Sequence, residues 1–156
     1  MRLHIAAPGR PHHPGAIAWG ADLYDRIGRI VPIERHAARE VRRRTAGPDA
    51  DARQREAAAL RALLPSGAHA VALDPGAKSM DSDAFLRWFV AHCESAGRPL
   101  WFVIGGPDGL DAAVLGACRD RLALGPMTLP HELAEVVLLE QLYRALTRWK
   151  GLPYHR

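Results

Sequence analysis

The feature that most constrains this chain is an uninterrupted apolar run, LWFVI at residues 100–104, which stops at two glycines and a proline. A strand with one face in water alternates polar and apolar residues. A strand covered on both faces does not, and such strands are typical of parallel sheets flanked by helices. Glycine and proline directly after the run indicate that the strand ends there in a loop. The run therefore predicts a central strand of an α/β fold.

Strand and helix patterns alternate along the chain. Strands are predicted at residues 3–7, 31–36, 68–73, 100–104 and 122–124. The first helix is predicted from about Ala16, with apolar residues at helical spacing at Trp19, Leu23, Ile27 and Ile30. Later helices are predicted after Asp49 or Asp51, after Ser82 and over residues 131–150. This alternation predicts one α/β domain over residues 1–156, with a mostly parallel sheet flanked by helices.

Length and composition support one globular domain. The chain has 156 residues, of which 48% are hydrophobic and 24% charged. We see no signal peptide and no membrane-length apolar run, so we expect a cytoplasmic protein without a membrane segment. Cys93 and Cys118 lack metal or redox spacing, and we expect no metal. The net charge is +4, and 19 of the 21 basic residues are arginine. This balance permits nucleic-acid binding without requiring it.

Three predicted strands end in loops rich in glycine or proline, at residues 73–76, 105–109 and 124–130. Ligands of open α/β sheets bind beyond the carboxyl ends of the strands, where glycine lets a ligand approach the backbone. Each loop alone is better explained as a turn, whereas three neighbouring loops together favour a pocket. No dinucleotide-binding glycine motif, P-loop or G-x-S-x-G elbow is present, which excludes the usual forms of those three sites.

Specific motifs gather in the second half of the chain. They are FVIGGPDGL at residues 102–110, MTLPH at 127–131, LEQLYRA at 139–145 and PYHR at 153–156, preceded by LDPGAK at 73–78. Their order and spacing resemble the ribosomal RNA large-subunit methyltransferase H family of the SPOUT class. The first third of the chain resembles that family only in layout.

The resemblance implies S-adenosyl-L-methionine (SAM) as methyl donor and N3 of a pseudouridine in 23S rRNA as acceptor. It also implies a C-terminal trefoil knot and a homodimer that shares its active site between subunits. The residues implied to contact SAM are Leu73, Gly105, Gly106, Leu124, Gly125, Pro126, Met127, Thr128 and Leu129. The tail residues Tyr154, His155 and Arg156 are implied to reach the acceptor site, that of the partner subunit.

Roles within the tail and the last helix stay open. His155 is our candidate for assisting the loss of the N3 proton, since histidine titrates near neutrality; the alternative is contact with RNA phosphate or with the partner. Arg144, Arg148 and Arg156 are candidates for RNA binding, although Arg144 is also placed to pair with Glu140. An apolar stripe on the last helix consists of Leu138, Leu142, Ala145, Leu146 and Trp149. It packs in the core or in a dimer interface, and we expect the dimer interface for part of it.

One departure from the family pattern is Glu135, where the family usually carries arginine. An anion near a phosphate-rich substrate would weaken binding unless Arg144 or Arg148 compensates. Glu135 therefore motivates an alternative, a ribosome-binding protein of the same fold whose catalysis has decayed. A SPOUT methyltransferase that acts on tRNA is a further alternative.

Overall fold

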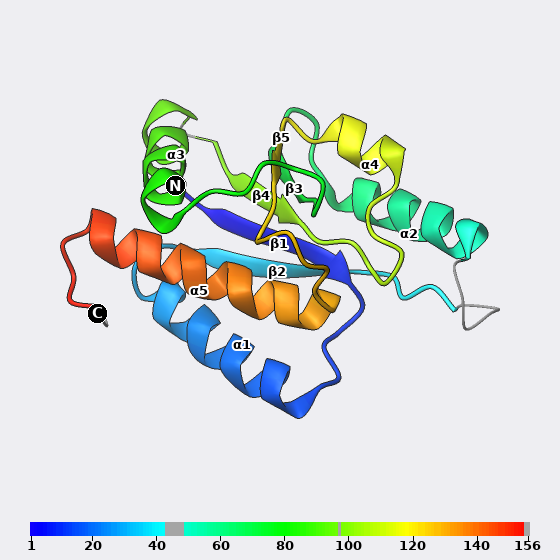
Figure 1. The fold of residues 1–156 in the computed structure, drawn as a ribbon, viewed down its shortest axis with the longest axis horizontal. Helices are drawn as coiled ribbons and strands as arrows, with labels where there is room; N and C mark the ends of the chain where they lie inside the picture. The colour runs from blue at the N-terminus through cyan, green and yellow to red at the C-terminus, as the bar shows by residue number, and fades with distance from the viewer. Residues whose placement is uncertain (43–48, 97, 155–156) are drawn as a thin grey trace.

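A computed structural model gives the structure and describes residues 1–42, 49–96 and 98–154 (Figure 1). The helices and strands alternate as the sequence predicts. They are β1 (Leu3–Pro8), α1 (Pro14–Gly28), β2 (Ile33–Ala38), α2 (Ala50–Leu63), β3 (His69–Leu73), α3 (Ser82–Ala96), β4 (Leu100–Val103), α4 (Ala112–Ala117), β5 (Asp120–Leu122) and α5 (His131–Trp149). The last strand begins two residues before its predicted position, and Ala123 follows it as an isolated bridge to Ser79.

The five strands form one sheet in the order β2-β1-β4-β3-β5, and every neighbouring pair is parallel. This confirms the predicted α/β fold with a parallel sheet. β4 lies between β1 and β3, and all four of its residues are buried. The apolar run that predicted a central strand therefore occupies the middle of the sheet.

Helices cover both faces of the sheet. α1, α3 and α5 pack on one face, while α2 and α4 pack on the other (Figure 1). Successive residues of β4 serve opposite faces: Phe102 lies in the core under α3 and α5, and Trp101 and Val103 lie in the core under α2 and α4. Alternating side-chain direction along a strand is the physical reason for this division.

The apolar stripe of α5 belongs to the core of the subunit. Leu138, Leu142, Ala145 and Leu146 are at most 2% exposed, and Trp149 packs partly against the same core. The expectation that part of this stripe forms the dimer interface is therefore wrong for the four buried residues, and for Trp149 it stays a prediction. α5 lies between α1 and α3 and must bury apolar residues against both of them and against the sheet.

The stripe of α1 divides between the core and the surface. Leu23 and Ile27 are buried, as the helical spacing predicts, whereas Trp19 is 67% exposed. Trp19 lies near the amino end of α1 and faces a groove beside the start of α5. Periodicity identified the apolar face of the helix correctly, but it could not show that the subunit leaves the first turns of that face uncovered.

A buried ion pair joins α1, β2 and α5. Arg35 donates to Glu135 twice, from Nε to Oε1 at 2.8 Å and from Nη2 to Oε2 at 3.0 Å. The Tyr24 hydroxyl donates to the same Oε1 at 2.8 Å, and Arg35 Nη1 donates to the Gly9 carbonyl at 2.8 Å. Burial, together with the Glu135 charge, raises the pKa of Tyr24, which stays a hydrogen-bond donor at neutral pH. The Glu135 carboxylate is thus neutralised inside the protein.

We expect Arg35→Met to lower the free energy of unfolding by about 3 kcal/mol, because it leaves the Glu135 carboxylate buried without its cation. Urea denaturation followed by circular dichroism measures this loss. The control is Arg29→Met, which removes an exposed pair with Asp25 and is expected to leave stability unchanged. Equal effects from the two variants would contradict a structural role for the buried pair.

Candidate functional site

The three glycine- and proline-containing loops meet around one cavity of about 470 Å³. The loops follow β3, β4 and β5, and the start of α5 closes the cavity. This location follows from the sheet order, because β4, β3 and β5 are neighbours and parallel strands end at the same edge. The volume falls in the range of small-molecule and cofactor sites. The loops therefore form a pocket rather than three separate turns.

Eight of the nine residues predicted to contact SAM line this cavity. They are Leu73, Gly105, Gly106, Leu124, Gly125, Met127, Thr128 and Leu129. Pro126 belongs to the same loop but is not among the lining residues. The sequence reasoning missed Ile104, Leu122, His131 and Ala134, which also line the cavity. Their positions could have identified them, because each lies at or directly after the end of a strand or in the first turn of α5.

The loop after β4 closes tightly on itself. A Cβ added to Gly105 would lie 2.8 Å from the Gly109 carbonyl carbon and 2.8 Å from the Leu110 nitrogen. Gly109 has a φ of +70°, and its N–H donates to the Gly106 carbonyl at 2.9 Å. The glycine at 105 is therefore needed first by the loop itself. Gly105 also lines the cavity.

Glu56 on α2 holds the second glycine of this loop. Its Oε1 accepts the Gly106 N–H at 2.7 Å, and a Cβ at Gly106 would lie 2.8 Å from the Glu56 carboxyl carbon. A carboxylate from the opposite helix layer thus positions a backbone group of the cavity. No sequence motif pointed to Glu56, because it is 50 residues away from its partner.

The walls of the cavity combine apolar side chains with backbone groups. Leu73 and Leu122 end β3 and β5, Ile104 directly follows β4, and Met127 is 76% exposed. The Asp74 carboxylate lies 3.5 Å from Arg121 and accepts the Gly76 N–H at 2.9 Å, which folds the loop after β3. Apolar walls with backbone donors and acceptors suit a flat heteroaromatic base, which is sandwiched by apolar groups and read at its edges.

The tail packs onto the middle of α5. The Tyr154 hydroxyl donates to Glu140 at 3.0 Å, and Arg144 binds the same carboxylate at 2.5 Å. The Arg144 guanidinium lies 5.0 Å from the Tyr154 ring centre, and Tyr143 meets that ring edge-on. Burial, followed by the Glu140 carboxylate, raises the pKa of Tyr154. The predicted pair between Arg144 and Glu140 is thus present, while Arg148 lies 2.7 Å from Asp83.

The tail and the cavity of one chain lie apart. Glu140, which anchors Tyr154, is six residues along α5 from Ala134, the nearest cavity-lining residue of this helix, or about 9 Å at 1.5 Å per residue. His155 and Arg156 lie outside the described residues. The described part of the tail is not among the residues that line the cavity.

The remaining predictions concern cysteines and membranes. Burial raises the pKa of Cys93 to about 12 and that of Cys118 to about 11, so both thiols stay protonated and unreactive at neutral pH. In the part of the chain that the structure describes, no helix has the length and apolar character needed to cross a membrane.

Comparison with known proteins gives consistent matches. Residues 1–155 match the family described as "Predicted SPOUT methyltransferase". The chain is 44% identical to "Ribosomal RNA large subunit methyltransferase H" of Gemmatimonas aurantiaca over 156 residues, which cover 100% of both chains. It is 42% identical to the protein of that name from Anaeromyxobacter sp. over 157 residues, again covering 100% of both.

Two solved structures share the fold. A probable methyltransferase from Bordetella pertussis superposes with a TM-score of 0.54 at 18% identity, covering 93% of this chain and 94% of that one. A probable methylase family protein from Haemophilus influenzae gives a TM-score of 0.53 at 14% identity, covering 98% of this chain and 70% of that one. At these identities the likeness concerns the fold alone.

We expect Gly105→Ala to lower the free energy of unfolding by about 1–3 kcal/mol, because the new methyl group meets backbone atoms that cannot move independently. Thermal and urea unfolding measure the loss. The matched control is Gly116→Ala on α4, where a Cβ meets nothing within 4 Å and stability should stay the same or rise. If Gly105→Ala proved as stable as Gly116→Ala, the loop would not need the glycine.

Proposed function

We propose, from the premise that this chain belongs to the SPOUT methyltransferase family, that it transfers a methyl group from SAM to N3 of a pseudouridine in 23S rRNA of the large ribosomal subunit. One observation carries the proposal: eight of nine residues named for SAM from sequence line a single cavity. The curated relatives with full-length coverage are named as methyltransferases of the large-subunit RNA, which supports the class of acceptor.

The cavity residues fit SAM in their chemistry. The apolar side chains of Leu73, Leu122 and Leu129 would hold the adenine ring, and the backbone of residues 124–129 would read its edge. The loop that contains Gly105 and Gly106, which both line the cavity, would contact the rest of the molecule. When bound, SAM supplies a methyl group that is already activated for displacement. The protein therefore has mainly to align the acceptor and exclude water.

The acceptor nitrogen must also lose a proton. We assign assistance in this step to His155, because a neutral imidazole can accept a proton near pH 7. Tyr154 and Arg156 would position the acceptor nucleotide beside it. Arg144 and Arg148 are assigned to RNA phosphate; both are ion-paired in the structure and would have to exchange a carboxylate partner for phosphate.

A homodimer would bring a tail to a cavity. The groove beside the start of α5 has a volume of about 610 Å³ and a mainly apolar lining that includes Ala16, Trp19, Leu133 and Val136. Trp19 and Leu133 are 67% and 44% exposed, which is costly for large apolar side chains in water. His131 lines both this groove and the cavity. A second copy bound here would lie next to the cavity and would place its tail within reach.

The C-terminal segment is proposed to form a trefoil knot, as in the SPOUT class. The proposal rests on the match of residues 1–155 to the SPOUT family. β5 pairs with β3 at one edge of the sheet, and α5 then returns across the sheet to pack against α1 and α3. The loop between them, residues 123–130, builds one wall of the cavity. A knotted loop would hold that wall rigid.

The structure removes the reason for the alternative of a catalytically decayed protein. Glu135 was its only support, and its carboxylate is buried and paired with Arg35 instead of facing a substrate. The tRNA alternative is decided by the assay below.

We expect the full-length protein to transfer labelled methyl from SAM to ribosomes that lack the modification, and not to free tRNA. Deletion of residues 154–156 should reduce transfer by at least about 10²-fold, since it removes the group that assists proton loss. SAM affinity measured by calorimetry should change less than about twofold in the truncated protein, because the cavity is intact. Arg61→Ala, an exposed change on α2, is the control and should retain full activity.

Two outcomes would contradict this assignment. Label on tRNA alone would identify a different substrate. Full activity of the truncated protein would show that the tail takes no part in transfer.

We expect light scattering to give a mass near twice 17.1 kDa for the unaltered protein. Trp19→Glu should shift the mass toward the monomer, because a charge would enter an apolar contact. The control is Ile17→Glu on the same helix, where Ile17 is 46% exposed but lies outside the groove. A monomeric unaltered protein, or a dimer unaffected by Trp19→Glu, would contradict an interface at this groove.

A further inference from the structure

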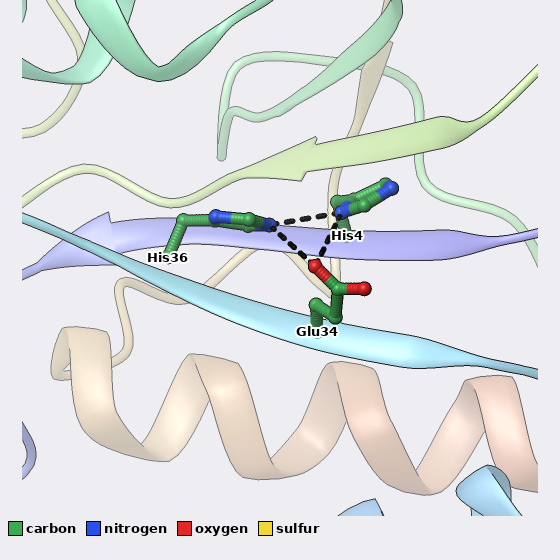
Figure 2. Close-up of side chains that lie close together, drawn as sticks. All are labelled: His4, Glu34 and His36. Atoms are coloured by element: carbon green, nitrogen blue, oxygen red, sulfur yellow. Dashed lines mark hydrogen bonds and ion pairs between the residues drawn. The ribbon is translucent and has the colours of Figure 1, made fainter.

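Three side chains that methyl transfer does not use converge at the amino ends of β1 and β2. They are His4, Glu34 and His36 (Figure 2). His4 and Glu34 are direct partners in the pairing of the two strands, and His36 follows Glu34 on the same face. Two adjacent strands thus deliver all three groups, and the backbone hydrogen bonds of the sheet fix their relative positions.

The spacing of the three polar atoms matches a metal site. His4 Nδ1 lies 2.9 Å from His36 Nε2, and Glu34 Oε2 lies 3.9 Å and 3.8 Å from these two atoms. The point equidistant from the three atoms lies in their plane, about 2.1 Å from each, which is the length of Zn–N and Zn–O bonds. A tetrahedral ion lies out of that plane, so the two nitrogens would move apart from their 2.9 Å contact and the carboxylate would move closer to them on binding. Two imidazoles and one carboxylate also form the ligand set of several zinc sites, which keep the fourth position for water.

The neighbouring side chains hold these groups in place. The His4 ring stacks on Trp101, with ring centres 4.3 Å apart and planes 11° apart, and the His36 ring centre lies 4.7 Å from the Trp101 ring centre. Arg2 lies 3.8 Å from the other oxygen of Glu34 and leaves Oε2 directed at the histidines. The two histidines, held by Trp101 before the ion arrives, lose little freedom on binding, whereas the half-exposed Glu34 side chain becomes ordered by it.

Hydrogen bonding alone accounts for only part of this arrangement. Two ring nitrogens 2.9 Å apart share one proton, so at least one of them presents a lone pair to the other. The Glu34 oxygen is too far from both for a hydrogen bond. The space between the three atoms has the size of an ion. We propose that His4, Glu34 and His36 bind a divalent transition-metal cation of the zinc type.

A second cluster, His69, His92 and Asp120, provides the comparison. His69 Nε2 lies 2.7 Å from Asp120 Oδ2, and His92 Nε2 lies 3.4 Å from the same oxygen. Both rings converge on one carboxylate oxygen, an arrangement that hydrogen bonds satisfy without a cation. Among the described residues these are the two clusters with metal-ligand spacing, and the geometry favours the first.

The proposed ion would link the edge strand to its neighbour. β2 is an outer strand of the sheet, bonded to β1 alone among the described strands. The cavity lies at the carboxyl ends of the strands and the three ligands near the amino ends, so the ion has no place in methyl transfer. The proposed ion would stabilise the protein rather than activate it, and its binding does not depend on the proposed function.

The test is calorimetric titration with Zn²⁺ after dialysis against a chelator. We expect one ion per chain and a higher melting temperature with the ion bound. His36→Ala should weaken the affinity at least about 10²-fold, more than loss of a residue that only orients a ligand. Glu34→Gln keeps the size of the side chain and should weaken binding too, which decides the matter if His36→Ala fails to fold. His92→Ala is the matched control and should bind like the unaltered protein.

Three results would overturn the proposal. They are the absence of stoichiometric Zn²⁺ binding by the unaltered protein, unchanged affinity in folded His36→Ala or in Glu34→Gln, and loss of binding in His92→Ala alone. The last would place the ion at the second cluster. Co²⁺ substitution supplies a separate readout, because a visible absorption band that is present in the unaltered protein should disappear in Glu34→Gln.

Discussion

The parallel pairing of β4 with β1 and β3 is the constraint on which the rest of this structure depends. A strand bonded on both sides and covered on both faces carries mainly apolar side chains, and residues 100–104 are all apolar. Because all neighbours are parallel, the strands end at one edge. The loops that follow the strands therefore lie side by side at that edge, and the strand pairing alone brings them together.

α5 connects the parts that matter for function. Its first residue lines the cavity, its middle buries Leu138, Leu139 and Leu142, and its later turns hold the tail through Glu140. Glu135 fastens this helix to β2 through Arg35 and to α1 through Tyr24. The Glu135 carboxylate, which departs from the family pattern in the sequence, therefore holds three elements of the fold together. Its cost of burial is offset by two hydrogen bonds from one guanidinium and a third from a hydroxyl.

The two ends of the sheet carry different chemistry. The carboxyl ends present glycine loops and backbone groups, which suit a ligand that is read by its shape. The amino ends carry two histidine–carboxylate clusters, on opposite faces of the sheet and on strands that the backbone holds in register. The described part of the tail packs on Glu140 and is not among the residues that line the cavity, and the site proposed above takes its tail from a second subunit.

The sequence by itself determined the order and type of the elements, the central place of residues 100–104 and the loops that form the cavity. These follow from local periodicity and from glycine and proline positions, which the chain carries wherever it folds. Only the tertiary structure decided the direction of Glu135, the burial of the α5 stripe, the exposure of Trp19, and the contacts of Glu56 with Gly106 and of His4 with His36. Each depends on residues far apart in the chain, and whether a side chain meets water, an ion or a neighbour is settled only when the layers pack together.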